Sequence, residues 1–592
     1  MFAPAAFRGT FRTDTVARAV YSESAGVLRS APRAVAVPSD TDDVAALLAW
    51  ATANHTPIIP RGSGSSMSGA AVGDGVLLDL SVLRDGPEVD PSWLLVRCGP
   101  GVTRGSVERA ARAHGLRFPV DPSSGAFCSV GGMASTNAAG ARTLRYGAMR
   151  HWVLGLDCVF ADGSRAWVRR GALLPDSIAP LARFAAAAEV LRERARSVAL
   201  PEVRKNASGY GLAAFADSGD LVDLLVGSEG TLAAFVGLEL GLVEGAAGTA
   251  SLLVAFPTLG EAVRGAELAR EAGASACELL DRTFLDLAKE AGRIPLEREF
   301  EAVLLIELES ARQEQEGRSA SVDREAFVAE SRSVAVDDAA DIEGDMSEST
   351  IASTIDGGRR PPPRVHAALV ARAEALERAM RRAGASAVRI GLDRESEEGL
   401  WSLRHAVSPI LSRLDSSIAS MQVIEDGVVP PHRLGEYVAG VRRALERAGF
   451  RGVIFGHAAD ANVHVNALVD LSRAGWRSRL ERLLDDVVEL TARLGGTLSG
   501  EHGDGRLRTP LLPRVWPVDA LELFREIKAL FDPTATLNPG VKVPIAGARP
   551  LGDIKYDPAL PPLPISAQRV LERVSRERAY DRLRLELLDE AV

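Results

Sequence analysis

Arg61-Gly62-Ser63-Gly64-Ser65-Ser66-Met67-Ser68-Gly69 is a run of small residues between two short apolar segments, 57–60 and 76–80, which both read as β-strands. Small residues leave successive backbone N–H groups exposed and close together, which is how a loop cradles a diphosphate. A P-loop or a dinucleotide-binding turn would open a helix, whereas a strand follows here. The run therefore predicts a phosphate-binding loop of another kind, with a flexible connector as the alternative.

The segments around this loop alternate between strands and helices. Residues 34–37 predict a strand and 42–53 a helix that Ser39, Asp40 or Thr41 would cap. Further along, 94–98 predicts a strand, 104–114 a helix, and 152–160 with 165–168 a hairpin around Asp162-Gly163.

Other glycine-rich stretches follow in the same half of the chain. Residues 129–140 consist largely of glycine, alanine and small polar residues, a composition that suits backbone passing close to a large flat ligand. Shorter stretches of this kind lie at 118–124, 205–210 and 227–232.

Composition narrows the class of protein. The chain has 592 residues, 46% hydrophobic content and a formal charge of −10, and it has no dense Lys/Arg run of the kind that binds nucleic acid. The four cysteines are widely spaced and form no Cys-x-x-Cys pair, which argues against an iron–sulfur or zinc motif and for free thiols in a reducing cytoplasm. We also expect no signal peptide and no membrane span.

The second half of the chain begins near residue 246. Strands at 252–256 and 303–308 and a helix at 259–272 predict a second α+β domain, interrupted by a polar insertion at about 311–360. We expect four parts: an extension 1–29, a first domain 30–245, a second domain 246–545 and a tail 546–592.

Two stretches of the second domain carry chemistry. Gly456-His457-Ala458-Ala459-Asp460-Ala461-Asn462-Val463-His464 holds two histidines seven residues apart, a spacing that fits two strands joined by a tight loop. Ser499-Gly500-Glu501-His502-Gly503-Asp504-Gly505-Arg506, reached after a helix-like run 480–494, would add an oxygen ligand from Glu501. Two imidazoles and a carboxylate form a divalent-metal set of the Zn, Mn or Fe type. The alternatives are structural histidines and a polar surface turn.

Two more residues have candidate roles. His502 is the natural proton acceptor, since its unperturbed pKa lies near neutrality. A helix beginning at Leu400 would place Arg404 and Ser408 one turn apart, and arginine suits bidentate binding of a carboxylate. A surface salt bridge is the other reading of Arg404.

The glycine-rich stretches of the first half occur in the order seen in the vanillyl-alcohol-oxidase (PCMH) type of FAD-binding domain, which they resemble. This resemblance implies an α+β fold in which two subdomains grip an extended FAD. Members with covalent FAD usually carry a histidine in the first loop, where this chain has Ser65 and Ser66, so we expect non-covalent FAD. The resemblance assigns cofactor contacts to Arg61, Gly62, Ser63, Gly64, Ser65, Ser66, Ser68, Pro122, Ser123, Ser124, Gly131, Gly132, Asn137, Gly140, Glu229, Gly230, Thr231 and Asn538.

The two histidine-bearing stretches resemble the C-terminal motifs of the FAD-linked D-2-hydroxy-acid dehydrogenases, which act on D-lactate, glycolate or D-2-hydroxyglutarate. Phe531-Asp532-Pro533 and Asn538-Pro539-Gly540-Val541-Lys542 match the closing segment of that family, and the resemblance spans about residues 30–545. It implies a substrate domain with an antiparallel sheet. Ala459 and Ala461 depart from the family's pattern. In 2-hydroxyglutarate enzymes a lysine binds the distal carboxylate of the substrate, and this chain has no counterpart of that lysine near Ile424.

The resemblance implies oxidation of a D-2-hydroxy acid to its 2-oxo acid. His457, His464 and Glu501 would bind the metal, His502 would act as base, Arg404 would bind the carboxylate, and Ser408 and Asn466 would add substrate contacts. Lys555-Tyr556-Asp557 resembles the start of the longer members, which continue into an iron–sulfur region.

Because no cluster-forming cysteines follow the flavin region, we expect a separate acceptor: an electron-transfer protein, an iron–sulfur protein or a quinone. We expect a cytoplasmic protein, with attachment to the inner membrane and a homodimer left open. The rival functions are a metal-independent flavin oxidase of an alcohol or phenol and a non-catalytic FAD-binding subunit.

Overall fold

The computed structural model describes residues 3–290, 300–310, 363–406, 410–411 and 417–590. Ser408 and the insertion expected at about 311–360 lie outside these residues.

The small-residue loop 61–69 follows an edge strand of the first sheet. Four strands lie in the order β1-β2-β4-β3, with β2 and β3 both parallel to β4 and β1 antiparallel to β2. The elements are β1 (Thr10–Arg12), α1 (Thr15–Val20), β2 (Ala34–Val37), α2 (Thr41–Ala53), β3 (Ile58–Arg61), β4 (Val76–Asp79) and η1 (Leu80–Val82). The side chain of Asp40 caps α2 by accepting from the N–H groups of Asp42 and Asp43.

A second, antiparallel sheet follows in the order β5-β6-β10-β8-β9. Its strands are β5 (Glu88–Asp90), β6 (Leu95–Cys98), β8 (Val153–Val159), β9 (Arg165–Arg169) and β10 (Ala234–Gly241), and β7 (Leu116–Arg117) pairs separately with β11 (Val243–Glu244). The helices are α3 (Arg104–Ala113), α4 (Val130–Thr136), α5 (Thr143–Tyr146), η2 (Met149–His151), α6 (Ala179–Ser197), α7 (Leu212–Ser218) and α8 (Val222–Leu225).

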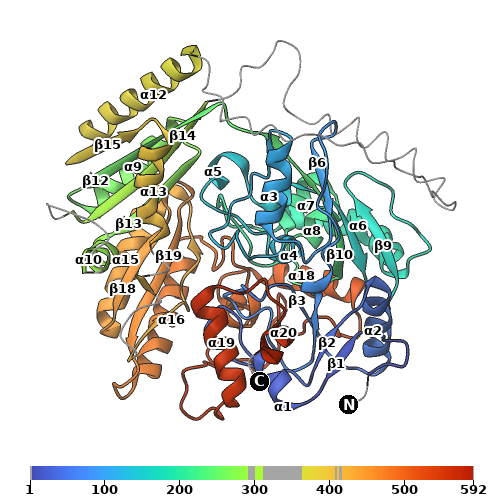
Figure 1. The fold of residues 1–592 in the computed structure, drawn as a ribbon. Helices are drawn as coiled ribbons and strands as arrows, with labels where there is room; N and C mark the ends of the chain where they lie inside the picture. Colours follow the sequence, from blue (N-terminus) through green and yellow to red (C-terminus); the bar gives the residue numbers. More distant parts are fainter. Residues whose placement is uncertain (1–2, 291–299, 311–362, 407–409, 412–416, 591–592) are drawn as a thin grey trace.

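The third sheet is antiparallel throughout and lies on the other side of the molecule (Figure 1). Its order is β15-β12-β14-β13-β18-β19-β16, and β17 also pairs with β19. The strands are β12 (Gly248–Phe256), β13 (Ala276–Asp281), β14 (Ala302–Ser310), β15 (Ala387–Gly391), β16 (Ile418–Met421), β17 (Gly427–Val428), β18 (Arg451–His457) and β19 (Asn462–Asp470).

Helices cover both faces of this sheet because its strands alternate buried side chains between them. One apolar cluster joins β14 residues such as Leu304 and Ile306 to α9 (Leu259–Glu271), α12 (Pro363–Arg382), α15 (Leu434–Ala448) and α16 (Trp476–Arg493). Val303 faces the opposite way, toward α10 (Arg282–Glu290). Leu403 of α13 (Arg394–His405) packs against the apolar cluster on this second face, to which Val303 belongs.

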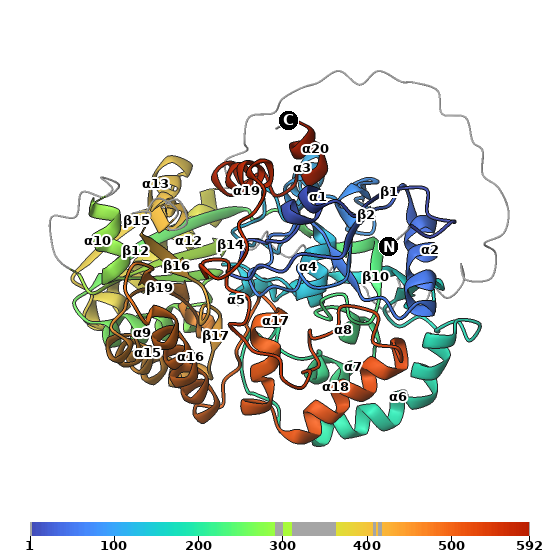
Figure 2. The same ribbon diagram turned by 90° about the horizontal axis from the view of Figure 1, so that it is seen from below.

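The chain after α16 returns to the first half (Figure 2). It forms α17 (Gly505–Arg508), η5 (Thr509–Arg514) and α18 (Val518–Phe531), which buries Phe524 and Phe531 in the core of the second sheet. Two further helices, α19 (Ile565–Glu577) and α20 (Arg584–Asp589), pack against α1. The remaining 3-10 turns are η3 (Pro431–Arg433) and η4 (Ala458–Asp460).

The α+β fold expected from the sequence is confirmed, including the antiparallel sheet of the second half. The helix that carries Arg404 begins at Arg394 and not at Leu400, because Asp393 and Ser396 form a capping box six residues further upstream than the sequence suggested. Among the described helices, none is long and apolar enough to cross a membrane.

Candidate functional site

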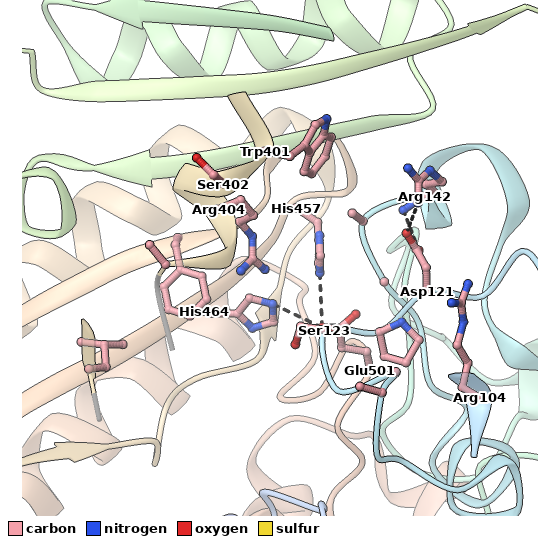
Figure 3. A pocket seen from close by; sticks show the side chains of 18 of the residues that line it. Arg104, Asp121, Ser123, Arg142, Trp401, Ser402, Arg404, His457, His464 and Glu501 are labelled. Atoms are coloured by element: carbon pink, nitrogen blue, oxygen red, sulfur yellow. Dashed lines mark hydrogen bonds and ion pairs between the residues drawn. The ribbon is translucent and has the colours of Figure 1, made fainter. Parts of the chain in front are cut away.

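Three imidazole rings converge on one carboxylate oxygen in the cleft between the two halves. The Nε2 atoms of His457, His464 and His502 lie 3.3, 3.3 and 3.4 Å from Glu501 Oε1. Figure 3 shows His457 and His464 pointing toward Glu501, with Arg404 beside them. The structure therefore places all four predicted metal and base residues at one point.

A hairpin brings the first two rings together, as the seven-residue spacing predicts. His457 ends β18, Ala461 turns the chain with φ of 54°, and His464 lies on β19 opposite Phe455. A positive φ is unusual for alanine, so this turn is strained where glycine would be relaxed. The two ring centroids are 5.2 Å apart.

The Nδ1 atom of each ring, on the side away from Glu501, contacts a carboxylate or a backbone carbonyl. His457 pairs with Glu278, His464 lies 2.8 Å from the backbone carbonyl of Glu425, and His502 lies 2.6 Å from Glu425 Oε2. A carbonyl can only accept, so neutral His464 carries its proton on Nδ1 and turns the lone pair of Nε2 toward Glu501.

Nitrogen lone pairs that face a carboxylate oxygen repel it unless a cation lies between them. Imidazoles oriented by a carboxylate or a carbonyl on the far nitrogen are the usual arrangement around a protein-bound metal. Two or three nitrogens with one oxygen suit Zn²⁺ or a similar divalent ion. The donor set therefore fits the metal expected from the sequence.

Asp426 lies close enough to join the cluster. Among the described residues, donor atoms of Asp426, His464, Glu501 and His502 come within 4.8 Å of one another, a set that contains His502 and not His457. Asp426 Oδ2 already accepts from Ser499 Oγ at 2.7 Å and from the N–H groups of Glu501 at 3.0 Å and His502 at 2.8 Å. We therefore interpret Asp426 as the anchor of the 499–506 loop.

The three histidines lie at similar distances from Glu501 but differ in the exposure of their side chains to solvent. The side chains of His457 and His464 are each 5% exposed, whereas that of His502 is 25% exposed. The more exposed ring is the one that a substrate in the cleft can reach, which favours His502 as the base.

Surrounding charges set the protonation of the cluster. Burial opposes ionisation of Glu501, but Lys205, whose Nζ lies 3.2 Å from Oε2, holds the pKa of that carboxyl well below its usual range. Burial also disfavours charged imidazoles, yet Glu278 raises the pKa of His457 to about 9 and Glu425 raises that of His502 to about 10. Without a metal both rings hold protons. A metal on His457 would displace the proton of that ring, and its positive charge would lower the pKa of the neighbouring His502, which would free Nε2 to accept a proton.

Arg404 is a cleft residue and not a surface ion pair. Its Nε donates to Glu278 Oε2 at 2.6 Å, its side chain is 12% exposed, and its guanidinium packs 5.3 Å from the Phe455 ring. Glu278 thus positions both Arg404 and His457. Arg404, Asn466 and the three histidines line one cleft of about 2380 Å³.

A narrower cavity of about 180 Å³ runs from the 61–69 loop to Glu501 and His502. The residues on its walls that the sequence assigned to the cofactor are Arg61, Gly62, Ser63, Gly64, Ser65, Ser66, Pro122, Ser123, Ser124, Gly131, Gly132, Glu229 and Gly230. The loop expected to hold a diphosphate and the histidine cluster are therefore the two ends of one space.

The loop carries unused donors that fit a diphosphate. The N–H groups of Gly64, Ser65 and Ser66 donate to no other group of the described chain, and the buried hydroxyl of Ser66 has no partner there either. A Cβ on Gly62 would lie 2.2 Å from Ser129 Oγ, so the two loops approach as closely as glycine permits. Consecutive free N–H groups in such a turn form an anion-binding nest.

Five other residues assigned to the cofactor do not line this cavity. Gly140 lines the larger cleft. The remaining four bond to neighbouring groups: Ser68 to the His502 carbonyl, Asn137 to the Asn206 carbonyl, Thr231 to Tyr210, and Asn538 to the carbonyls of Ala70 and Glu229. These side chains support the walls of the site.

Sequence reasoning gave no role to the groups behind the histidines. Glu278 comes from β13, far along the chain, and its only local signal is a carboxylate between apolar neighbours in that strand. Lys205 lies in the stretch 205–210, and Glu425 and Asp426 follow Ile424, but nothing in the sequence indicated which partners these three residues hold.

Comparison with known proteins identifies the families of the two domains and a structure with the same fold. The family of FAD binding domains matches residues 32–169, and the family of C-terminal domains of FAD linked oxidases matches 247–346 and 362–541. An alkyldihydroxyacetonephosphate synthase of known structure shares the fold, with a TM-score of 0.55, 14% identity and coverage of 89% of this chain and 82% of that one.

Curated relatives are more similar in sequence. A D-lactate dehydrogenase of Archaeoglobus fulgidus is 30% identical over 86% of this chain and 92% of its own length. The glycolate oxidase subunit GlcD of Bacillus subtilis is 26% identical over 90% and 93%. A D-2-hydroxyglutarate dehydrogenase of Pseudomonas putida is 25% identical over 92% of this chain but 52% of its own length. The chain belongs to the family of FAD-linked 2-hydroxy-acid dehydrogenases.

Proposed function

We propose that the chain oxidises a D-2-hydroxy acid to the 2-oxo acid with non-covalently bound FAD and a divalent metal. The observation that carries this proposal is the convergence of three Nε2 atoms on Glu501, which lies at the inner end of the cofactor cavity and in the cleft that Arg404 also lines. Lactate, glycolate and 2-hydroxyglutarate, the substrates in the relatives' names, share one carboxylate beside one hydroxyl.

The residues divide the work by their chemistry. Arg404 binds the substrate carboxylate, because its planar guanidinium matches a carboxylate and Glu278 fixes its orientation. Asn466 adds a polar contact from β19. His457, His464 and Glu501 would hold a divalent cation, which would polarise the substrate's hydroxyl group.

His502 removes the proton of that hydroxyl group at Nε2, while Glu425 holds its Nδ1. Bound FAD would supply the acceptor for the hydride of C2, which would leave C2 and its oxygen as the new carbonyl group. Arg508 pairs with the same Glu425 and so also ties this loop to the core.

Electrons then leave for a separate acceptor: an electron-transfer protein, an iron–sulfur protein or a quinone. All four cysteines are buried as free thiols in separate places, which supports an acceptor outside this chain. Turnover with an artificial dye should therefore greatly exceed production of hydrogen peroxide in air, and stoichiometric peroxide would indicate an oxidase instead.

Anaerobic reduction of the flavin tests the proposal directly. D- and L-lactate, glycolate, D- and L-2-hydroxyglutarate, a primary alcohol and a phenol are mixed with the oxidised protein, and bleaching of the flavin is followed. We expect bleaching by D-2-hydroxy acids alone or by these and glycolate. Bleaching by the alcohol or phenol only, or by none of the compounds, would contradict the proposed function.

A further inference from the structure

The C-terminal segment 546–592, which the structure describes as far as residue 590, lies against the outer side of the cofactor loop. Its helix α19 packs on α1 through Val570 and Val574, and the centroid of the Tyr580 ring lies 5.2 Å from that of Phe127, which precedes the cavity residue Cys128. Both family matches end before this segment, at 169 and 541.

One side chain of the segment reaches the loop itself. Arg584 is 3% exposed, and its Nη2 donates to the backbone carbonyl of Ser63 at 3.4 Å. Its Nη1 donates to the carbonyls of Ala579 and Arg582, so the segment holds its own arginine in place.

This contact fixes which way the loop peptides face. A peptide is planar and trans, so its C=O and N–H groups point in opposite directions. The Ser63 carbonyl turned to Arg584 therefore directs the Gly64 N–H the other way. The Gly64 carbonyl accepts from the N–H of Ala25 at 3.2 Å, which does the same for the N–H of Ser65. These are two of the N–H groups without partners described above.

The buried charges beside the loop also favour an anion at this site. Arg61 and Arg584 are each 3% exposed and sit near the single carboxylate Asp79, which also accepts from Tyr21 at 2.7 Å. Arg61 Nη2 and Arg584 Nε have no hydrogen-bond partner in the part of the chain that the structure describes. Burial, followed by the charge of Arg61, lowers the pKa of Arg584 to about 10. A buried site with two guanidinium groups and one carboxylate is stabilised by a nearby anion.

We propose that segment 546–592 closes the FAD site from outside and that Arg584 is a positioning residue for the loop that binds the diphosphate. Docking of the segment presents the N–H groups of Gly64 and Ser65 to the cofactor, and the two negative phosphates offset the buried guanidinium charges. Because coupling between two binding events is reciprocal, FAD also tightens the docking of the segment.

Three variants of the full chain test the role of Arg584. Arg584→Ala removes the contact, Arg584→Lys keeps the charge, and Arg582→Ala removes an exposed arginine of the same segment that pairs with Glu590. FAD dissociation constants come from flavin fluorescence on the reconstituted apoprotein. We expect a rise of roughly 10- to 100-fold for Arg584→Ala, the value of a charge-assisted hydrogen bond, partial rescue by Lys and no change for Arg582→Ala.

Two further measurements report on the diphosphate of FAD and do not depend on the overall stability of the protein. The ³¹P resonances of bound FAD should shift in Arg584→Ala and stay in place in Arg582→Ala. In the unaltered protein, limited proteolysis should cut segment 546–592 more slowly with FAD than without it, which decides the matter even if Arg584→Ala fails to fold. Equal FAD affinity in the Ala variants, or proteolysis that ignores FAD, would overturn the proposal. None of these readings needs turnover, so they stand apart from the test of substrate.

Discussion

His502 is the residue on which the chemistry depends most directly. It shares Glu501 Oε1 with the two other histidines but is the most exposed of the three. If it acts as the base and binds no metal, His502→Ala should keep both FAD and metal, while flavin reduction slows by ~10²–10⁴-fold. Stopped-flow reduction and metal analysis measure both properties.

The control for this variant is His432→Ala, at an exposed histidine of η3, which should behave as the unaltered protein. Loss of metal in His502→Ala, combined with retention in Glu501→Ala, would mean that these neighbours exchange roles.

Glu278 is the residue behind two others, since it holds His457 Nδ1 and Arg404 Nε. Glu278→Gln keeps the shape but cannot accept from both partners with full charge. We expect metal affinity to fall by about 10–100-fold, the usual effect of losing a carboxylate behind a ligating histidine. Competition with a chromogenic chelator measures it. Glu398→Gln, in the exposed pair with Arg394, should leave metal affinity unchanged, and an equal loss there would refute this role of Glu278.

The 499–506 loop is held as an element by buried charges from both halves of the chain. Lys542 Nζ lies 2.8 Å from Glu229 Oε1 and 3.0 Å from Asp504 Oδ2, and Glu229 also accepts from the N–H groups of Asp504 and Gly505. Lys542→Met would leave two carboxylates buried together without their cation. Breaking such a pair costs about 3–5 kcal/mol, so we expect a clear fall in Tm.

The matched control is Lys289→Met on the exposed end of α10, which should not change Tm. Thermal unfolding followed by circular dichroism compares the two, and similar Tm values for both variants would contradict the role given to Lys542.

At this scale the sequence predicted local geometry well. The hairpin of His457 and His464 follows from strand alternation, and the 61–69 loop from its small residues, since both depend on neighbours in the chain. The partners that these motifs contact in the fold do not depend on neighbours in the chain. Glu278 meets His457 across 179 residues and Arg584 meets Ser63 across 521, distances at which no local pattern carries information. The start of α13 was missed because Asp393 and Ser396 were not read as a capping box.

The whole molecule consists of two halves joined across the cleft by ion pairs. Arg142 from the first half donates to Asp121 Oδ2 at 2.7 Å and to Glu307 Oε2 of β14 at 2.6 Å, and Arg117 donates to Glu309 at 2.9 Å. Glu307 and Glu309 are almost fully buried, so their charges depend on these arginines. These pairs are therefore among the contacts that keep the loop and the histidines, the two ends of the reaction space, at a fixed separation.

Arg142→Met should therefore weaken the coupling between the halves. The unaltered protein should unfold in one cooperative transition, whereas the variant should show two, or one broadened transition, because Glu307 loses its cation and the interface opens first. Arg165→Met is the matched control, since Arg165 pairs with the buried Asp157 of the second sheet and donates to Thr41, both within the first half. It should lower Tm without splitting the transition. Differential scanning calorimetry separates the outcomes through the ratio of van't Hoff to calorimetric enthalpy, and an unchanged ratio in Arg142→Met would show that the halves are joined by other contacts.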